Sequence, residues 1–221
     1  MTEVLSLLTP LWVSLKVALS STLVVLGVGT LAGYQMSRYR GRSRSLIEGC
    51  LIAPLIMPPT VVGFILLMVL GKSSVIGQFL ARYDLQIIFT TTGAAIAASI
   101  VAFPLMYRAA LGAFEQIDAL LLDAARLDGA SEVEVFFCIA LPSAWPGILA
   151  GTVLTFARAL GEFGATLMVA GNIPGQTQTM PMAIYFAVEA GQTQEAWFWT
   201  VIILGTAYCG IVAVNAWQAL R

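Results

Sequence analysis

The chain has 221 residues, of which 59% are apolar and 10% are charged, whereas about a quarter of the residues of a soluble domain are charged. This composition excludes a soluble enzyme and indicates a helical membrane protein that crosses the bilayer several times. The net charge is −1, so charge alone gives no attraction to nucleic acid or to anionic lipid. We therefore expect membrane lipid around the chain and no nucleic-acid partner.

Histidine and cysteine give no sign of a catalytic or metal site. The sequence has no histidine, which excludes histidine-based acid–base chemistry and removes the commonest metal ligand. Cys50, Cys138 and Cys209 are far apart in apolar surroundings, without the spacing of a metal site or a disulfide framework. We expect them to be packing residues, and we expect no metal and no cofactor. Met1-Thr2-Glu3 has no basic region, so we expect no removable signal peptide.

The first apolar segment predicts a transmembrane helix. Residues 11–34 carry a single charge, Lys16, which is close enough to one end to reach the interface, and about 20 residues suffice to cross the hydrocarbon layer. The loop that follows, residues 37–44, holds four arginines and no acid. By the positive-inside rule this loop is cytoplasmic.

The second predicted span, residues 49–70, is uncharged but rich in proline. Pro54, Pro58 and Pro59 interrupt the helical hydrogen-bond ladder, so we expect a kink or an opening there. Free carbonyl groups inside a membrane are tolerable only beside protein or in a wet cavity. The break therefore indicates either a transport path or a bend that only shapes packing. Pro58, Pro59 and Thr60 are the candidate path residues.

The middle of the chain contains a third span and a polar segment. Gly71-Lys72-Ser73 resembles the end of a phosphate-binding loop, but the first glycine of that motif would fall at Leu66 and no strand precedes it. We interpret residues 71–84 as a short outer loop. The third span covers residues 85–107. Residues 108–134 then hold six acids against two arginines, which predicts a solvent-side helical segment that a soluble partner could grip.

The fourth predicted span, residues 143–171, is interrupted by Arg158 and Glu162 and is longer than a bilayer requires, so we expect it to be broken or tilted. An isolated charge in mid-span costs roughly 2.5–3.5 kcal/mol, and two opposite charges four residues apart share one helix face. One interpretation is a self-satisfied pair that pins the span to its neighbours. The other is a gate in which Arg158 attracts a passing dianion, while Glu162 limits its binding or holds the gate closed.

The last span completes one membrane domain, residues 10–220. Residues 172–181 are rich in turn formers, residues 182–190 predict a short helix at the outer surface, and residues 196–220 form the fifth span. The basic loop and the acidic segment then both face the cytoplasm, the N-terminus lies outside and the C-terminus lies inside. Small residues four apart, Gly29 with Gly33 and Gly147 with Gly151, predict close helix packing.

The acidic segment carries the motif that points to function. Asp123-Ala124-Ala125 is followed after three residues by Gly129 and after nine more by Ile139-Ala140-Leu141-Pro142. The alanines let another surface approach closely, and Gly129 permits a sharp turn, where we expect a side chain to clash with the turn or with a docked partner. Residues 131–138 begin a second helix, and Pro142 marks the re-entry into the membrane. A helix-turn-helix at the inner surface, about residues 115–142, fits a partner's groove, although an ordinary connector would also be consistent with the pattern.

This spacing resembles the signature of ABC-importer permeases, in which E-A-A, three residues, G, nine residues and I-x-L-P form coupling helices that sit in a cleft of the ATP-hydrolysing subunit. Asp123 replaces the usual glutamate, which keeps the charge and shortens its reach. The resemblance is to the molybdate permeases in particular, and sulfate and tungstate permeases are similar relatives. The stretches that carry it are Pro54–Gly63, Phe156–Ala165 and Gly171–Thr177.

The resemblance implies an all-α, type I ABC importer permease fold with about five spans in the cell (inner) membrane. It also implies a homodimer, two copies of a separate ATPase and an extracytoplasmic molybdate-binding protein that captures the oxyanion. The permease itself would do no chemistry. The alternatives are a tungstate or sulfate permease and, in another class, a free-standing anion channel or a membrane enzyme using Arg158 and Glu162. A channel needs no docking segment, and an enzyme would need more than one ionisable pair.

Overall fold

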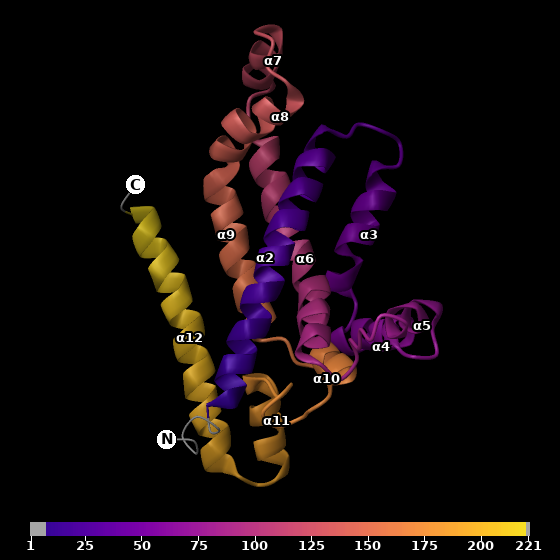
Figure 1. Cartoon of the computed structure of the whole chain (residues 1–221). Helices are drawn as coiled ribbons and strands as arrows, with labels where there is room; N and C mark the ends of the chain where they lie inside the picture. Colours follow the sequence, from indigo (N-terminus) through magenta and orange to yellow (C-terminus); the bar gives the residue numbers. More distant parts are fainter. Residues whose placement is uncertain (1–7, 220–221) are drawn as a thin grey trace.

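The structure is a computed structural model that describes residues 8–219, and every regular element in that range is helical (Figure 1). This confirms the all-α prediction. The expectations about a signal peptide at Met1-Thr2-Glu3 and about the C-terminal residues 220–221 lie outside the described residues. The helices are α2 (Thr9–Arg38), α3 (Arg44–Ile56), α4 (Pro59–Leu70), α5 (Val75–Ala81), α6 (Thr91–Glu115), α7 (Ala119–Leu127), α8 (Glu132–Glu134), η1 (Val135–Ala140), α9 (Leu141–Leu160), α10 (Gly164–Ala170), α11 (Met180–Glu189) and α12 (Thr193–Ala219).

Helix α6 is the centre of the bundle, with α2 and α9 packed closely against it. The glycine pairs make this possible. A Cβ atom added at Gly33 would lie 2.8 Å from the Cβ of Ala110, and one added at Gly151 would lie 2.5 Å from the Cβ of Ala109. Both distances are shorter than real Cβ contacts, so only glycine allows the backbones to approach this closely.

The proline-rich second span is broken into two helices. α3 ends at Ile56, α4 begins at Pro59, and their axes differ by 108°. Pro54 lies inside α3, so the break comes from Pro58 and Pro59. Pro58 has an extended backbone (φ −54°, ψ 134°) and Pro59 then opens α4, since proline is tolerated in the first helical turn but not further along. α4 and α5 therefore lie crosswise at the end of the bundle opposite to α7 and α8 (Figure 1).

The remaining spans differ from the sequence expectations at their ends. Helix α6 starts at Thr91 because Phe89 has a positive φ of 62° and Thr90 caps the first turn by accepting a hydrogen bond from the Gly93 amide. The expected outer loop of residues 71–84 contains the short helix α5.

Among the described residues, three helices are long and apolar enough to cross a membrane, and the bent α3–α4 pair would make a fourth. α12 covers most of the fifth predicted span and packs through Trp199 into the core.

Candidate coupling and gating site

The motif region folds as a helix-turn-helix at one end of the bundle (Figure 1). Asp118 starts α7 because its carboxylate accepts a hydrogen bond from the Leu120 amide at 2.9 Å. A capping box starts α8: the Ser131 hydroxyl accepts from the Glu134 amide, and the Glu134 carboxylate accepts from the Ser131 amide at 2.7 Å. The turn between them contains Gly129. The Asp118 cap therefore fixes where α7 begins, and the capping box fixes where α8 begins, directly after the turn.

Gly129 is required by backbone geometry and not by a lack of space. Its φ is +90°, and no heavy atom lies within 4 Å of a Cβ atom built at this position. The expected clash with the turn is therefore wrong within this chain. A side chain at Gly129 would instead strain the backbone, because L residues rarely adopt a positive φ.

A network of ion pairs holds the helix-turn-helix against α2. Glu132 accepts hydrogen bonds from Arg38 at 2.6 Å and from Arg126 at 2.9 Å, and Arg126 also donates to Asp123 at 2.6 Å. The hydrogen bond to Glu132, and then the one to Asp123, raise the pKa of Arg126, so this guanidinium stays charged. Arg38 comes from the basic loop, so the two segments expected in the cytoplasm lie at the same end of the bundle.

Several large apolar side chains at this polar end are exposed. On α7 and the turn, Leu120 is 75% exposed and Leu127 is 89% exposed, and Val133 and Phe137 follow with 65% and 60%. The motif residues Asp123, Ala124 and Gly129 are exposed as well, whereas Ala125 is half-buried. Large apolar side chains next to charged ones are typical of a surface that another protein covers.

The second half of the motif lies in a continuous helical rod, Glu132–Leu160. Residues 135–140 form a π-helix, in which the Leu141 amide bonds to the carbonyl of Phe136, five residues back. Pro142, expected to mark a fresh entry into the membrane, does not interrupt this rod, because the wider π turn before it accommodates a residue without an N–H donor. Ile139 and Leu141 are half-buried and Pro142 is exposed.

The charged pair of the fourth span lies at the far end of the same rod. Arg158 is near the C-terminus of α9 and donates to Glu162 at 2.6 Å. The other oxygen of Glu162 accepts from the Ala165 amide at 2.9 Å and so satisfies a free donor in the first turn of α10. The Glu162 side chain is 2% exposed and that of Arg158 is 29% exposed. The fourth span is therefore broken at residues 161–163, and the carboxylate joins its two parts.

Helix α10 brings the two sets of candidate gate residues together. A Cβ atom added at Gly164 would lie 3.3 Å from Pro59 and from Thr60, and one at Gly63 would lie 2.8 Å from the Cα of Ala165. α10 thus packs directly on the first turns of α4. Pro58, immediately before α4, is exposed. The broken second span and the broken fourth span therefore meet at their breaks.

Sequence reasoning missed the residues that make these connections. Arg38, Arg126 and Glu132 were visible only as members of a basic loop and an acidic segment. A single sequence cannot show which arginine meets which acid. Gly63 and Gly164 could have been noticed in the sequence, because glycine in an apolar run often marks close contact between backbones. The sequence does not show which segment each one contacts.

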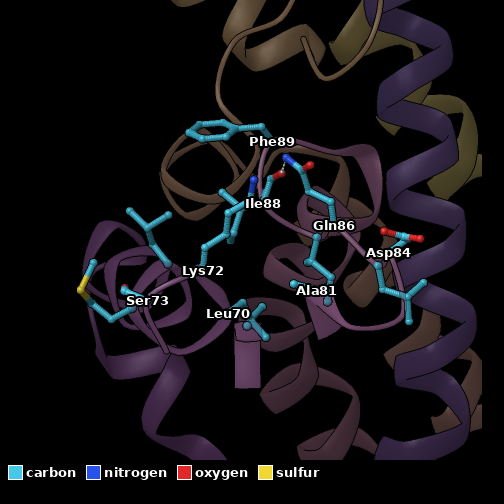
Figure 2. Close-up of a pocket in the computed structure, with 14 residues that line it drawn as sticks. Leu70, Lys72, Ser73, Ala81, Asp84, Gln86, Ile88 and Phe89 are labelled. Atoms are coloured by element: carbon cyan, nitrogen blue, oxygen red, sulfur yellow. Dashed lines mark hydrogen bonds between the residues drawn. The ribbon is translucent and has the colours of Figure 1, made fainter. Parts of the chain in front are cut away.

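A cavity of about 580 Å³ lies at the opposite end, between α4, α5 and the loop before α6. Figure 2 shows Lys72, Ser73, Asp84 and Gln86 around it, with a largely apolar remainder that includes Phe89. Gln86 is tied to its own loop by donating to the Ile88 carbonyl at 3.3 Å. Lys72 belongs to the run Gly71-Lys72-Ser73, which resembles the end of a phosphate-binding loop. In the structure this run follows helix α4 and not the strand that a phosphate-binding loop requires, in agreement with the sequence analysis.

The molecule combines a helix-turn-helix at one end with two broken spans whose breaks meet towards the other end (Figure 1). These are features of a multi-pass membrane permease. Comparison with known proteins specifies the family: the chain belongs to the binding-protein-dependent transport system inner membrane components, whose family model matches residues 26–220. Among solved structures, the chain is similar to an inward-facing MetNI methionine ABC transporter, with a TM-score of 0.74, 16% identity, and coverage of 100% of this chain and 99% of that one. This confirms the expected ABC-importer permease fold.

Curated relatives lie much nearer in sequence. YvgM of Bacillus subtilis, named a candidate permease of a molybdenum transport system, is 50% identical over 89% of this chain and 87% of its own length. The molybdenum transport system permease ModB of Escherichia coli strain K12 is 42% identical over 80% of this chain and 77% of its own. A sulfate transport system permease, CysW of Synechocystis, is 34% identical and is covered over 63% of its length.

Proposed function

We propose that the chain is the permease subunit of an ATP-driven molybdate importer. It forms the translocation path as a homodimer, couples it to two copies of a separate ATPase, and receives the anion from an extracytoplasmic molybdate-binding protein. The chain itself does no chemistry. The observation that carries this proposal is the exposed helix-turn-helix with the coupling signature at Asp123–Gly129, whose second helix continues without a break to Arg158, the partner of Glu162.

Molybdate is favoured over sulfate by the sequence relatives. The molybdenum permeases reach 42% and 50% identity, against 34% for the sulfate permease. Tungstate has the same charge and tetrahedral shape as molybdate, so it stays an alternative substrate. A free-standing channel is disfavoured because it would have no use for a docking surface.

Coupling follows from the rigid connection between the two ends. The rod Glu132–Leu160 has 29 residues, so at 1.5 Å per residue it is about 43 Å long. A displacement of the docked α7–α8 segment would move the rod, because α8 is its first turn and Arg126 of α7 is bound to Glu132. At the other end the same displacement reaches Glu162 and, through α10, the break at Pro58–Thr60. ATP-driven closure of the ATPase pair would thus open and close the path.

The gate itself lies where the two broken spans meet. Glu162 neutralises Arg158 and caps α10 at the same time, so a small rotation of α9 would break one of these two bonds. Freed from Glu162, Arg158 would offer a positive charge to the passing dianion. We therefore infer that the pair both pins α10 and closes the path between strokes.

The orientation follows from the charged loops. The arginine loop and the helix-turn-helix share one end, which the positive-inside rule places in the cytoplasm. The N-terminus, α11 and the cavity beside Lys72 then face outward, where the binding protein docks. The C-terminus is cytoplasmic.

The decisive experiment is ATP hydrolysis by the reconstituted assembly of permease, ATPase and binding protein. Molybdate is expected to stimulate hydrolysis more strongly than sulfate at equal concentration, and tungstate is measured beside them. Stronger stimulation by sulfate than by molybdate would move the assignment to a sulfate importer. Anion flux without the ATPase would overturn the importer class in favour of a channel.

A further inference from the structure

A second charged site lies at the α7–α8 end of the molecule, apart from the coupling surface. It is a pocket of about 600 Å³ between the start of α3 and the C-terminal part of α6. Arg42, Arg44 and Arg108 line it together with Ser45 and a single acid, Glu48. The proposed coupling and gating residues do not include any of these side chains.

The arginines of the pocket are incompletely neutralised. Glu48 accepts from Arg44 at 2.8 Å and lies 3.8 Å from Arg108, so one carboxylate serves two guanidinium groups. Arg44 is also held from outside the pocket by Glu115 at 2.5 Å. Arg42 has no ion pair within residues 8–219, and Arg108 has only the long contact with Glu48. With three arginines against Glu48 and Glu115, one positive charge is left over.

The shape of the pocket extends from this charged end into the apolar part of α3. Ser45, Gly49, Ile52 and Ile56 all line it, and their spacing of four, three and four residues places them on one face of the helix. A Cβ atom added at Gly49 would meet no heavy atom within 4 Å, so the middle of this groove is open. Ile56 is 80% exposed and lies two residues before Pro58, so the groove runs from the arginines to the break in the second span.

Arginine guanidinium groups are suited to tetrahedral oxyanions, because their planar N–H donors pair with two oxygens at once. We propose that this pocket binds a tetrahedral oxyanion group, held by Arg42, Arg108 and the Ser45 hydroxyl, while Arg44 anchors α3 to α6. Two sources supply this chemistry: the phosphate of an anionic phospholipid whose chain lies along the groove, or the transported anion on its way from the break. The second source rests on the proposed function, and the first does not.

The test measures binding to the purified full-length chain in a neutral detergent, without the ATPase. One arm titrates sodium molybdate by calorimetry. The other arm titrates a soluble short-chain phosphatidylglycerol, with phosphatidylcholine of equal chain length as its reference. The expected result is saturable binding of at least one of the two anions at one site per chain.

Three variants make the test specific. The double variant Arg42→Gln/Arg108→Gln is expected to weaken binding at least tenfold. The matched control Arg40→Gln/Arg82→Gln removes the same charge from exposed arginines outside the pocket and is expected to change the dissociation constant less than twofold. Gly49→Leu fills the open groove, so it abolishes phosphatidylglycerol binding and leaves molybdate binding unchanged.

The outcomes separate the sources and the proposals. If phosphatidylglycerol binds the unmodified chain more tightly than molybdate and Gly49→Leu abolishes that binding, the site is assigned to a lipid phosphate. If molybdate binds more tightly and its binding is unchanged in Gly49→Leu, the site is assigned to the free oxyanion. The proposed binding site would be refuted if both arginine double variants lost anion binding equally. It would also be refuted if the unmodified chain bound neither anion. Molybdate-stimulated ATP hydrolysis is measured separately in the full assembly, so failure of the pocket leaves the proposed function standing.

Discussion

At the scale of single residues, the bonds of Glu162 decide how the fourth span is built. Its carboxylate is 2% exposed, yet it is satisfied on both oxygens by Arg158 and by the Ala165 amide. A buried charge is tolerable only with such partners. Both the pinning and the gating interpretation of the pair are compatible with this geometry, because a bond that fixes α10 can also be the bond that opens.

Changes at Glu162 alone measure how much the pair and its bond to α10 stabilise the fold. Glu162→Ala leaves Arg158 without its partner and the Ala165 amide without its acceptor, so the folded state is expected to lose about 1–3 kcal/mol. Glu162→Gln keeps an oxygen for the amide and should lose less. Thermal unfolding in detergent measures both.

The double variant Arg158→Met/Glu162→Met is the control for gating. If the pair gates, this variant folds but hydrolyses ATP without transport. Normal coupled transport by the double methionine variant would leave only the structural role of the pair.

Gly129 gives a second test at the residue scale. Gly129→Val is expected to insert normally but to distort the turn, at a cost of about 1–2 kcal/mol for a side chain at positive φ, and to abolish stimulation of the ATPase. Asn tolerates this conformation better, so Gly129→Asn should retain most of the coupling. Insertion is measured by membrane fractionation and coupling by ATP hydrolysis. Equal loss in both variants would mean that a side chain clashes with the docked partner instead of straining the turn.

At the scale of helices, the bundle depends on backbone contact between α6 and its two neighbours. Gly33→Leu places side-chain atoms where Ala110 and the Leu111 amide already lie. We expect a loss of about 1–3 kcal/mol or failure to assemble. Gly27→Leu is the matched control on the same helix, because nothing lies within 4 Å of its Cβ position. A melting temperature lowered equally by both variants would rule out the close approach of α2 and α6.

The sequence predicted these contacts better than it predicted where the helices end. Hydrophobic length and the glycine spacing depend on local properties, so long apolar helices and close packing at Gly29–Gly33 and Gly147–Gly151 could be predicted, but the partner helix α6 could not. The start of α6 at Thr91 depends on a positive φ at Phe89, and the uninterrupted rod through Pro142 depends on a π turn. Neither the positive φ nor the π turn can be predicted from the residue types alone. The pairing of Glu132 with Arg38 is a contact between residues far apart in the chain, and one sequence gives no way to choose among the available acids.

At the scale of the whole molecule, the charged loops gather at one end and the broken spans at the other (Figure 1). The helix Glu132–Leu160 connects these ends. Because α9 packs on α6 and α6 packs on α2, a movement of the rod would be transmitted to the helices around it. In the proposed function, docking at one end would thereby be linked to the proposed gate at the other through packed helices, since the rod Glu132–Leu160 is continuous.

This arrangement predicts which residues an impermeant thiol reagent reaches from each side. In a background with Cys50, Cys138 and Cys209 replaced by alanine, Ser43→Cys and Ser131→Cys should be labelled only after the membrane is opened. Gln192→Cys, between α11 and α12, should be labelled in intact cells. All three positions are exposed, so a lack of labelling reports sidedness and not burial. The basic loop and the capping box are joined through Arg38 and Glu132, so both must give the same answer. Labelling of Ser43→Cys or Ser131→Cys in intact cells would show that the topology is the opposite of the one proposed. A cytoplasmic ATPase could then not reach the helix-turn-helix α7–α8.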